Sequence, residues 1–272
     1  MTNQPPNPVA VVTGASSGIG EAFARLLAAR GYDLILVARR KEKLDAVAVD
    51  IAGMKTVNVE VVTADLSTEK GIASLEKKLS ESVRIDLLIN DAGFGTTGAF
   101  HEVESEKQAA MMTLQFEAPV RLSRAVLPGM LERRSGSIIN LSSISSFFPT
   151  PNRTLYGAVK AAMNQFSRSL AAEVGRFGIR VQCLAPGFTY SGFHDTPEFA
   201  GWSRSQVSKA LWMTSEQVAK ISLLELARNR KVIVIPGWMN RLVVFLNTNP
   251  LTWPFMRAAM KRRLNDPTLE MQ

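Results

Sequence analysis

The segment Val9-Ala-Val-Val-Thr-Gly-Ala-Ser-Ser-Gly-Ile-Gly20 joins a short apolar run to a glycine-rich turn. The run predicts a buried strand, and the residues after it, Gly20–Arg30, have the spacing of a helix. Gly14 allows a sharp turn, Gly18 allows the backbone to approach a pyrophosphate, and Gly20 allows a helix to pack closely on the strand. Because a helix N-terminus offers free N–H groups to anions, this context favours a phosphate-binding turn over a plain tight turn.

Short apolar runs and helical patterns alternate along most of the chain. Several runs carry consecutive β-branched residues, which is typical of a parallel sheet covered on both faces. The predicted strands are Val9–Thr13, Leu34–Val37, Val57–Thr63, Leu87–Asn90, Ser137–Leu141, Arg180–Leu184 and Val232–Ile235. The predicted helices between them are Gly20–Arg30, Lys41–Ile51, Thr68–Leu79, Ser105–Arg133 and Leu155–Arg176. This alternation predicts an α/β fold over residues 1–272: a single-domain, Rossmann-type, doubly wound parallel sheet of about seven strands with helices on both faces.

The alternation pauses near Tyr190. Residues 190–213 are predicted to form a loop region with short helices, and Ser215–Asn229 a helix that Ser215 opens without a full capping box. Residues 239–264 are predicted to form a C-terminal extension of two helices, separated at Asn247–Pro250.

Composition excludes several classes of protein. Apolar residues make up 46% and charged residues 21%, which are globular values. The single cysteine, Cys183, excludes an internal disulfide framework, and two histidines, His101 and His194, are too few for a zinc site, so no metal is expected. No apolar run is long enough to span a membrane, and the first residues do not resemble a signal peptide. We therefore expect a cytoplasmic protein.

The net charge of +8 is concentrated near the C-terminus. Residues 201–272 contain 11 Lys and Arg against 4 Asp and Glu, and all four tryptophans. The basic excess could meet an acidic substrate or an anionic membrane, although an ordinary solvated surface is favoured. The segment Arg241–Arg263 is amphipathic and could contact a membrane surface. We favour a pair of helices that covers the substrate cleft or a partner subunit, because Asn247–Pro250 would interrupt a long amphipathic helix. The basic residues are not interleaved with aromatic residues on the predicted strands, so nucleic-acid binding is not expected.

The end of the second predicted strand indicates which dinucleotide would bind. Dinucleotide-binding folds often carry a carboxylate at the end of this strand that binds the ribose 2′-hydroxyl. This chain has Ala38-Arg-Arg40 at that position. Two guanidinium groups can pair with a 2′-phosphate, so the sequence favours NADP(H) over NAD(H). The alternative is that Arg39 and Arg40 only begin the helix Lys41–Ile51 on a solvated face.

Tyr156 and Lys160 are spaced to share one face of a helix. A nearby ammonium stabilises a phenolate, so such a pair can act as a general acid and base near neutral pH. A tyrosine and a lysine with this spacing often occur by chance when no other motif accompanies them. Here, however, Ser143 precedes it directly after the strand Ser137–Leu141.

Together with the glycine turn, these residues resemble the short-chain dehydrogenase/reductase family. Asn90-Asp-Ala-Gly93 is similar to that family's Asn-Asn-Ala-Gly segment, and Pro186-Gly187 to its Pro-Gly turn beside the nicotinamide. The resemblance covers roughly residues 8–240, and the segments Leu36–Leu44 and Pro236–Arg241 are similar to an NADP(H)-preferring bacterial oxidoreductase group. It implies hydride transfer between NADP(H) and a carbonyl compound or secondary alcohol, and a homodimer or homotetramer.

The resemblance also implies a role for individual residues. Tyr156 would exchange the proton with the substrate oxygen, Lys160 would lower the pKa of Tyr156 and hold the nicotinamide ribose, and Ser143 would orient the substrate oxygen. The implied cofactor-binding residues are Gly14, Ser16, Ser17, Gly18, Ile19, Gly20, Arg39, Arg40, Asp65, Asn90, Ala92, Gly93, Tyr156, Lys160, Pro186, Gly187 and Thr189.

Two residues depart from the family pattern. Gln115 stands where the family usually has an asparagine that supports a water chain to the lysine, and Asp91 replaces the second asparagine of the Asn-Asn-Ala-Gly segment. Both departures predict slower turnover than is usual in the family, but the same class of reaction. They also motivate an alternative, a dinucleotide-binding regulator or scaffold with little turnover.

Aromatic residues are concentrated in the loops that follow the predicted strands, where open α/β sheets bind their substrates. This predicts a bulky apolar carbonyl compound or alcohol. His194 is expected at the surface and Cys183 in the inert core. The candidate substrate residues are Phe94, Phe148, Tyr190, Phe193 and Trp212.

Overall fold

The computed structural model describes residues 6–54, 57–82, 84–194, 199 and 203–264. Its main sheet is seven-stranded, in the order β3-β2-β1-β4-β5-β6-β9, and every pair of neighbours is parallel. The strands of this sheet are β1 (Val9–Thr13), β2 (Asp33–Ala38), β3 (Val59–Thr63), β4 (Leu87–Asn90), β5 (Gly136–Leu141), β6 (Ile179–Leu184) and β9 (Ile233–Val234). The predicted doubly wound α/β fold is confirmed.

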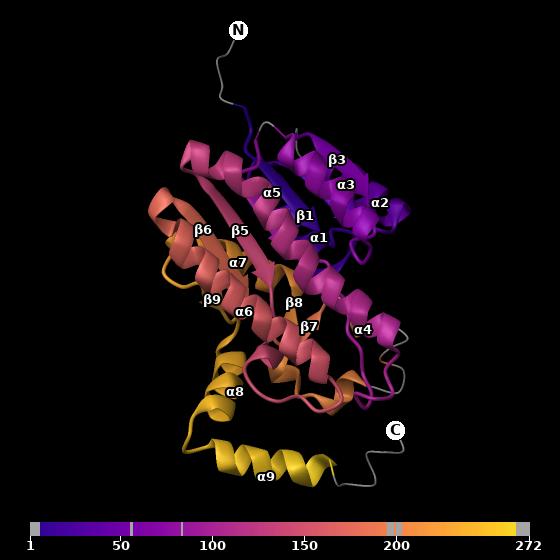
Figure 1. The fold of residues 1–272 in the computed structure, drawn as a ribbon, viewed down its shortest axis with the longest axis vertical. Helices are drawn as coiled ribbons and strands as arrows, with labels where there is room; N and C mark the ends of the chain where they lie inside the picture. The colour runs from indigo at the N-terminus through magenta and orange to yellow at the C-terminus, as the bar shows by residue number, and fades with distance from the viewer. Residues whose placement is uncertain (1–5, 55–56, 83, 195–198, 200–202, 265–272) are drawn as a thin grey trace.

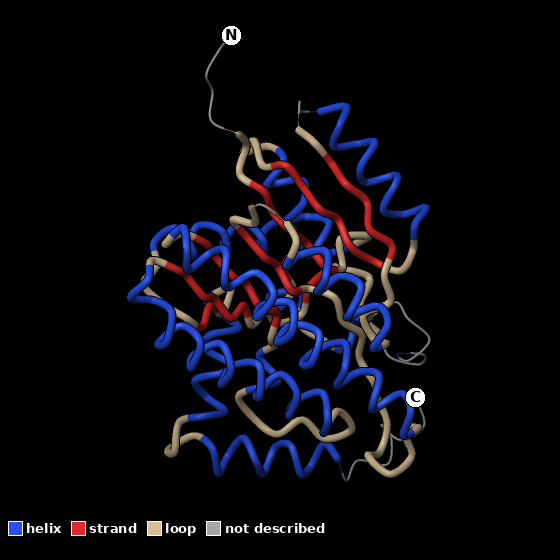
Figure 2. Tube along the Cα trace, turned by 45° about the horizontal axis from the view of Figure 1, so that its top comes forward, coloured by secondary structure: helices blue, strands red, loops and turns tan. Residues whose placement is uncertain are grey.

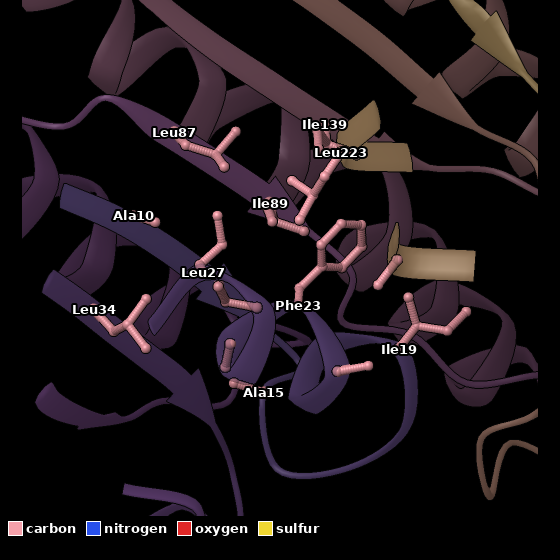
Figure 3. Close-up of a cluster of buried hydrophobic side chains, with 14 of the residues drawn as sticks. Ala10, Ala15, Ile19, Phe23, Leu27, Leu34, Leu87, Ile89, Ile139 and Leu223 are labelled. Atoms are coloured by element: carbon pink, nitrogen blue, oxygen red, sulfur yellow. The ribbon is translucent and has the colours of Figure 1, made fainter. Parts of the chain in front are cut away.

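Helices cover both faces of the sheet, as Figures 1 and 2 show. The helices are α1 (Gly18–Ala28), α2 (Lys41–Met54), α3 (Glu69–Ser80), α4 (Ser105–Met112), α5 (Ala118–Arg133), α6 (Thr154–Val174), α7 (Ser215–Arg228), α8 (Trp238–Thr248) and α9 (Trp253–Leu264). One core cluster joins α1, α2 and α7 to the sheet, and a second joins α3, α5 and α6 to the other face. Figure 3 shows the first cluster, where the fully buried Phe23 of α1 lies among side chains of the central strands.

The predicted helix Ser105–Arg133 is divided in the structure. A π-helical turn at Thr113–Glu117 separates α4 from α5. Such turns widen the backbone helix by one residue and are frequent at functional sites. The π-helical turn contains Gln115, one of the two residues that depart from the family pattern.

Residues 190–213, the predicted loop region, connect two very short strands. These are β7 (Thr189–Tyr190) and β8 (Met213–Thr214), which pair in parallel, and short 3₁₀ helices at 204–206 and 209–211 lie between them. The expectation that Ser215 opens α7 without a full capping box is wrong. Thr214 is the N-cap, its hydroxyl accepts from the Gln217 amide at 3.2 Å, and the Gln217 side chain accepts from the Thr214 amide at 3.0 Å.

The C-terminal extension consists of α8 and α9, separated near the predicted Asn247–Pro250 break. In Figure 1 the two helices lie beyond one end of the sheet rather than on either of its faces. Trp238 of α8 is 68% exposed. No described helix is long and apolar enough to cross a membrane.

The order of the strands fixes where a ligand would bind. The chain moves outward from β1 to β2 and β3, and then returns to β4 on the other side of β1. In open parallel sheets this reversal leaves a crevice at the carboxyl ends of the strands. The glycine turn follows β1 and residues 91–93 follow β4, so both lie at that crevice.

Candidate active site

A cavity of about 1260 Å³ lies at the carboxyl ends of the strands. Its lining comes from the glycine turn, the segments after β2 and β4, residues 141–160, and residues 186–194. Most of the predicted site residues are thus gathered around one space. Of the predicted residues, Gly20, Asp65, Asn90, Tyr190 and Trp212 are not among those that line it.

The glycine turn has a backbone that tolerates no side chain at its key positions. Gly14 and Gly18 have φ of 72° and 63°. A Cβ on Gly18 would lie 2.6 Å from the Ser191 carbonyl oxygen, and one on Gly20 would lie 2.5 Å from the Gly14 oxygen. Ser17, the N-cap of α1, makes no side-chain capping bond. The N-terminus of α1 therefore has backbone N–H groups that no Ser17 side chain caps, and such groups can bind a pyrophosphate.

Arginines lie beside this turn. Arg40 donates to the Ser16 and Ser17 hydroxyls at 3.0 and 3.1 Å, so it contacts the turn rather than only beginning α2 on a solvated face. Arg39 is exposed at the rim. Burial acts to raise the pKa of Asp65, but hydrogen bonds from the Ser67 hydroxyl and amide, with a smaller effect from the charge of Arg39, hold that pKa below the ordinary value. The Asp65 carboxylate accepts from the Ser67 amide at 3.0 Å.

The three predicted catalytic side chains meet between β5 and the start of α6. Lys160 is 5% exposed, and its ammonium donates to the Leu141 carbonyl at 2.8 Å. The same ammonium lies 5.7 Å from the centroid of the Tyr156 ring. Ser143 begins the short helix Ile144–Ser146, and its hydroxyl accepts from the Ser145 amide at 3.2 Å. Backbone contacts thus fix the lysine and the serine on either side of the tyrosine.

Burial dominates the electrostatics of this group. It raises the pKa of Tyr156 above 10, while a hydrogen bond with Ser143 and the charge of Arg153 oppose the rise. It also lowers the pKa of Lys160 to about 8, against the attraction of Asp91. The expected lowering of the Tyr156 pKa by Lys160 stays a prediction, because the groups that oppose burial here are Ser143 and Arg153.

Asp91 lies against the N-terminus of α1. Its carboxyl accepts from the Gly20 amide, and burial raises its pKa to about 7, although the charge of Lys160 and the Gly20 hydrogen bond act in the opposite direction. A Cβ on Gly14 would come within 3.1 Å of its Oδ2 atom. The carboxyl therefore has a partner in the fold and lies within electrostatic range of Lys160.

Asn90 faces the interior instead of the cavity. Its amide donates to Asn140 Oδ1 at 2.8 Å, and Asn140 in turn donates to the Ser167 hydroxyl at 3.0 Å. Asn90 is 4% exposed, so it connects β4 to β5 and, through Asn140, to α6. This contact pattern is structural, whereas Ala92 and Gly93 do line the cavity.

Gln115 is buried in the π-helical turn, with 2% of its surface exposed. Its Nε2 donates to the Phe94 carbonyl at 2.6 Å, and its Oε1 has no hydrogen-bond partner. A Cβ on Gly93 would lie 3.0 Å from that oxygen. The longer amide therefore holds the loop after β4 and leaves an unpaired acceptor beside the cofactor segment.

The Pro186–Thr189 segment lines the cavity on the side of β6. The Pro186 carbonyl accepts from the Ile144 amide at 3.0 Å, and the Thr189 hydroxyl donates to the Gly187 carbonyl at 3.1 Å. Asn240 of α8, which was not among the predicted site residues, packs on this turn. Its Oδ1 has no partner, and a Cβ on Gly187 would lie 2.2 Å from it.

Aromatic side chains form one wall of the cavity. Phe94, Phe148 and Phe193 line it, as predicted. The Tyr156 and Phe193 ring centroids are 5.9 Å apart, and those of Phe193 and Phe199 are 5.5 Å apart. His194 is not the surface residue that was expected, because its ring lies 5.0 Å from Phe199, among these aromatics.

Two of the predicted substrate residues lie behind this wall. Tyr190 is 45% exposed and stacks on Trp212 at 4.7 Å, while Trp212 is 8% exposed beneath it. They support the loop instead of lining the cavity. Arg153, in contrast, lines the cavity and was not predicted, because only the fold brings the residue before α6 into contact with Phe199.

Comparison with known proteins agrees with this geometry. Residues 8–197 match the family model described as short chain dehydrogenase. The chain belongs to the short-chain dehydrogenase/reductase family. It is 36% identical over 194 residues to an uncharacterized oxidoreductase of Staphylococcus epidermidis, a match that covers 71% of this chain and 80% of the relative.

Two solved structures of this family are similar over almost the whole chain. A short-chain dehydrogenase from Sphingobium yanoikuyae in complex with NADPH has a TM-score of 0.80 and 32% identity, with 95% of each chain covered. A bulky-bulky ketone specific alcohol dehydrogenase from Comamonas testosteroni has a TM-score of 0.76 and 30% identity, with 96% of this chain and 95% of that chain covered. As a short-chain dehydrogenase/reductase, the protein is an oxidoreductase of a family that uses a nicotinamide dinucleotide and acts on small molecules.

Proposed function

We propose that this short-chain dehydrogenase/reductase transfers a hydride between NADP(H) and a bulky apolar carbonyl compound or secondary alcohol. The observation that carries the proposal is the placement of Ser143, Tyr156 and Lys160 around the same cavity as the glycine turn. The turn at one end suits a pyrophosphate, and the hydroxyl groups at the other suit a carbonyl oxygen.

The preference for NADP(H) is supported by the side chains after β2. Arg39, Arg40 and Lys43 all line this end of the cavity. Three cations suit an added phosphate dianion, and Glu42, the carboxylate of this segment, is not among the residues that line the cavity. The NADPH complex of the similar Sphingobium protein points in the same direction.

The protein's own residues would manage the proton. The bound nicotinamide supplies or accepts the hydride. During reduction Tyr156 donates its hydroxyl proton to the substrate oxygen, and during oxidation its phenolate takes that proton back. Ser143 donates a hydrogen bond to the same oxygen and orients it. The Lys160 ammonium, which donates to the Leu141 carbonyl, would favour the phenolate and would hold the ribose hydroxyls of the bound cofactor.

The lining of the cavity supports a bulky apolar substrate. Phe94, Phe148 and Phe193 line it, and the ring centroid of Phe193 lies 5.9 Å from that of Tyr156. The similar Comamonas alcohol dehydrogenase is specific for bulky-bulky ketones. A cytoplasmic location and a homodimer or homotetramer stay predictions.

The test is titration of the protein with NADPH and NADH, followed by a panel of aryl and cyclic ketones at the NADPH absorbance. We expect tighter binding of NADPH and turnover of the bulkier ketones. Equal binding of both dinucleotides would contradict the role of the arginines. Tight NADPH binding without turnover of any ketone would favour the alternative, a dinucleotide-binding regulator, which the displaced amide of Gln115 motivates.

A further inference from the structure

Arg153 brings a positive charge into the aromatic part of the cavity. It directly precedes α6, is half-buried, and lines the cavity together with Tyr156. Its guanidinium carbon lies 4.9 Å from the centroid of the Phe199 ring. Arg153 is the N-cap of α6 and Tyr156 is the third residue of that helix, and the charge of Arg153 acts on the Tyr156 hydroxyl.

The guanidinium of Arg153 has no carboxylate partner among the described residues. Other arginines do: Arg25 pairs with Asp50 at 2.8 Å, and Arg84 with Asp86 at 2.8 Å. Among the described residues that line the cavity, Asp91 is the one with an acidic side chain. Its carboxyl accepts a hydrogen bond from the Gly20 amide and does not pair with Arg153. Packing over Phe199 therefore satisfies the face of the guanidinium, while its N–H donors have no hydrogen-bond partner in the part of the chain that the structure describes.

An unpaired, partly desolvated cation is costly in a folded protein. Burial lowers the pKa of Arg153, and only the electrostatic interaction with Tyr156 opposes this. A ligand that carries an anionic group would remove the cost, because a planar guanidinium pairs with a carboxylate through two parallel hydrogen bonds. The arrangement is thus suited to an acidic group at one end of an otherwise apolar substrate.

We propose that Arg153 selects substrates in which a carboxylate, separated from the reacting carbonyl by an apolar segment, binds to its guanidinium. This rests on the proposed carbonyl reduction and narrows it to oxo acids. The carbonyl oxygen lies at Tyr156 and Ser143, the apolar segment packs on Phe193 and Phe199, and the carboxylate pairs with Arg153.

The first experiment compares 5-benzoylpentanoate with its methyl ester, which differs only in the charge. We expect the wild-type protein to have the higher kcat/KM for the acid. Arg153→Met keeps an apolar stem over Phe199 but removes the charge. It should lower kcat/KM for the acid roughly 10- to 100-fold, mainly through KM, because a hydrogen bond to a charged group is worth that much. The loss for the ester should be at least tenfold smaller, and Arg153→Lys should recover part of the loss for the acid.

Arg176→Met is the matched control. Arg176 also lies over a phenylalanine ring, 4.7 Å from the centroid of Phe177, but at the far end of α6. It should leave kcat/KM for both compounds unchanged. Equal losses for acid and ester in Arg153→Met would overturn the proposal, because the arginine would then act only on Tyr156.

A binding measurement separates this proposal from the proposed function. Calorimetry with NADPH-saturated protein compares 5-phenylpentanoate with 5-phenylpentan-1-ol, neither of which has a carbonyl group that NADPH could reduce under these conditions. We expect the acid to bind more tightly in the wild type and this preference to disappear in Arg153→Met. If the preference is present but no ketone is reduced, the carbonyl reductase fails while the acid site stands. If ketone esters are reduced but no acid preference is found, the reductase stands and the acid site is refuted.

Discussion

Asp91→Asn should make the protein more stable, and increasingly so as the pH rises. The folded protein holds the Asp91 proton up to about pH 7, whereas an unperturbed aspartate has a pKa of 3.8. The folded state therefore binds more protons than the unfolded state between these values, and stability falls as the pH rises through this window. An asparagine oxygen can still accept from the Gly20 amide without carrying the charge.

The magnitude follows from the two pKa values. A rise from 3.8 to about 7 corresponds to about 4 kcal/mol of unfavourable free energy when the carboxylate is fully ionised. Because part of that cost is already present at pH 5, the stability difference between Asp91→Asn and the wild type should grow by roughly 2 to 3 kcal/mol between pH 5 and pH 8. Above pH 8 it should level off.

Urea unfolding, followed by tryptophan fluorescence at a fixed protomer concentration, measures this difference at each pH. Asp45→Asn is the control, because it removes the same charge from a side chain that is 44% exposed and pairs with Lys41 on the surface of α2. The control should show little change with pH. The reasoning would be refuted if the stability difference between Asp91→Asn and the wild type were constant from pH 5 to pH 8. It would also be refuted if Asp91→Asn were less stable than the wild type at pH 8, because the buried carboxyl would then have no raised pKa.

Three further substitutions test other parts of the site. Arg40→Ala should raise KM for NADPH about tenfold and leave KM for NADH nearly unchanged, because it removes a charged donor beside the 2′ position; equal effects on both cofactors in steady-state kinetics would exclude a phosphate contact. Gly18→Ala, at φ 63° and 2.6 Å from the Ser191 oxygen, should lower the free energy of unfolding by about 1 to 3 kcal/mol and weaken NADPH binding in calorimetry; an unaltered urea midpoint would contradict this. Gly187→Ala should weaken NADPH binding in the wild type but less so when combined with Asn240→Ala, which clears the overlapping side chain; additive binding energies in the double-mutant cycle would show that the contact has no role.

The sheet and its order along the chain were predictable because buried parallel strands leave a strong local pattern. The strand Leu87–Asn90 was predicted with its observed bounds, and Val57–Thr63 begins two residues later, at Val59. The glycine turn was equally clear, since Gly14 and Gly18 have positive φ values that few other residues adopt.

The π-helical turn was not predictable from helical spacing. The helical spacing over Ser105–Arg133 gives no sign of the π-helical turn at Thr113–Glu117, because an extra residue in one turn is a feature of the backbone. The capping box of α7 is missed from the sequence because the N-cap is Thr214, one residue before the predicted Ser215, and Thr214 ends β8 and opens the helix at the same time.

The side chains that the sequence did not assign are those whose contacts join distant segments. Arg153 reaches Phe199 across 46 positions of the chain, and Asn240 reaches Gly187 across 53. The segment Pro236–Arg241 resembles the family pattern but assigns no role to Asn240. Tyr190 and Trp212 were assigned to the substrate on composition, whereas their stacking on each other places them outside the cavity lining.

The central claim is that Tyr156 exchanges the proton in an NADP(H)-dependent reaction, and Tyr156→Phe tests it most directly. The substitution keeps the ring beside Phe193 and removes only the hydroxyl. NADPH should bind with an unchanged Kd, while the single-turnover rate of ketone reduction should fall by at least about a hundredfold, as expected for the loss of a general acid. A wild-type rate in Tyr156→Phe, with NADPH bound, would contradict the account.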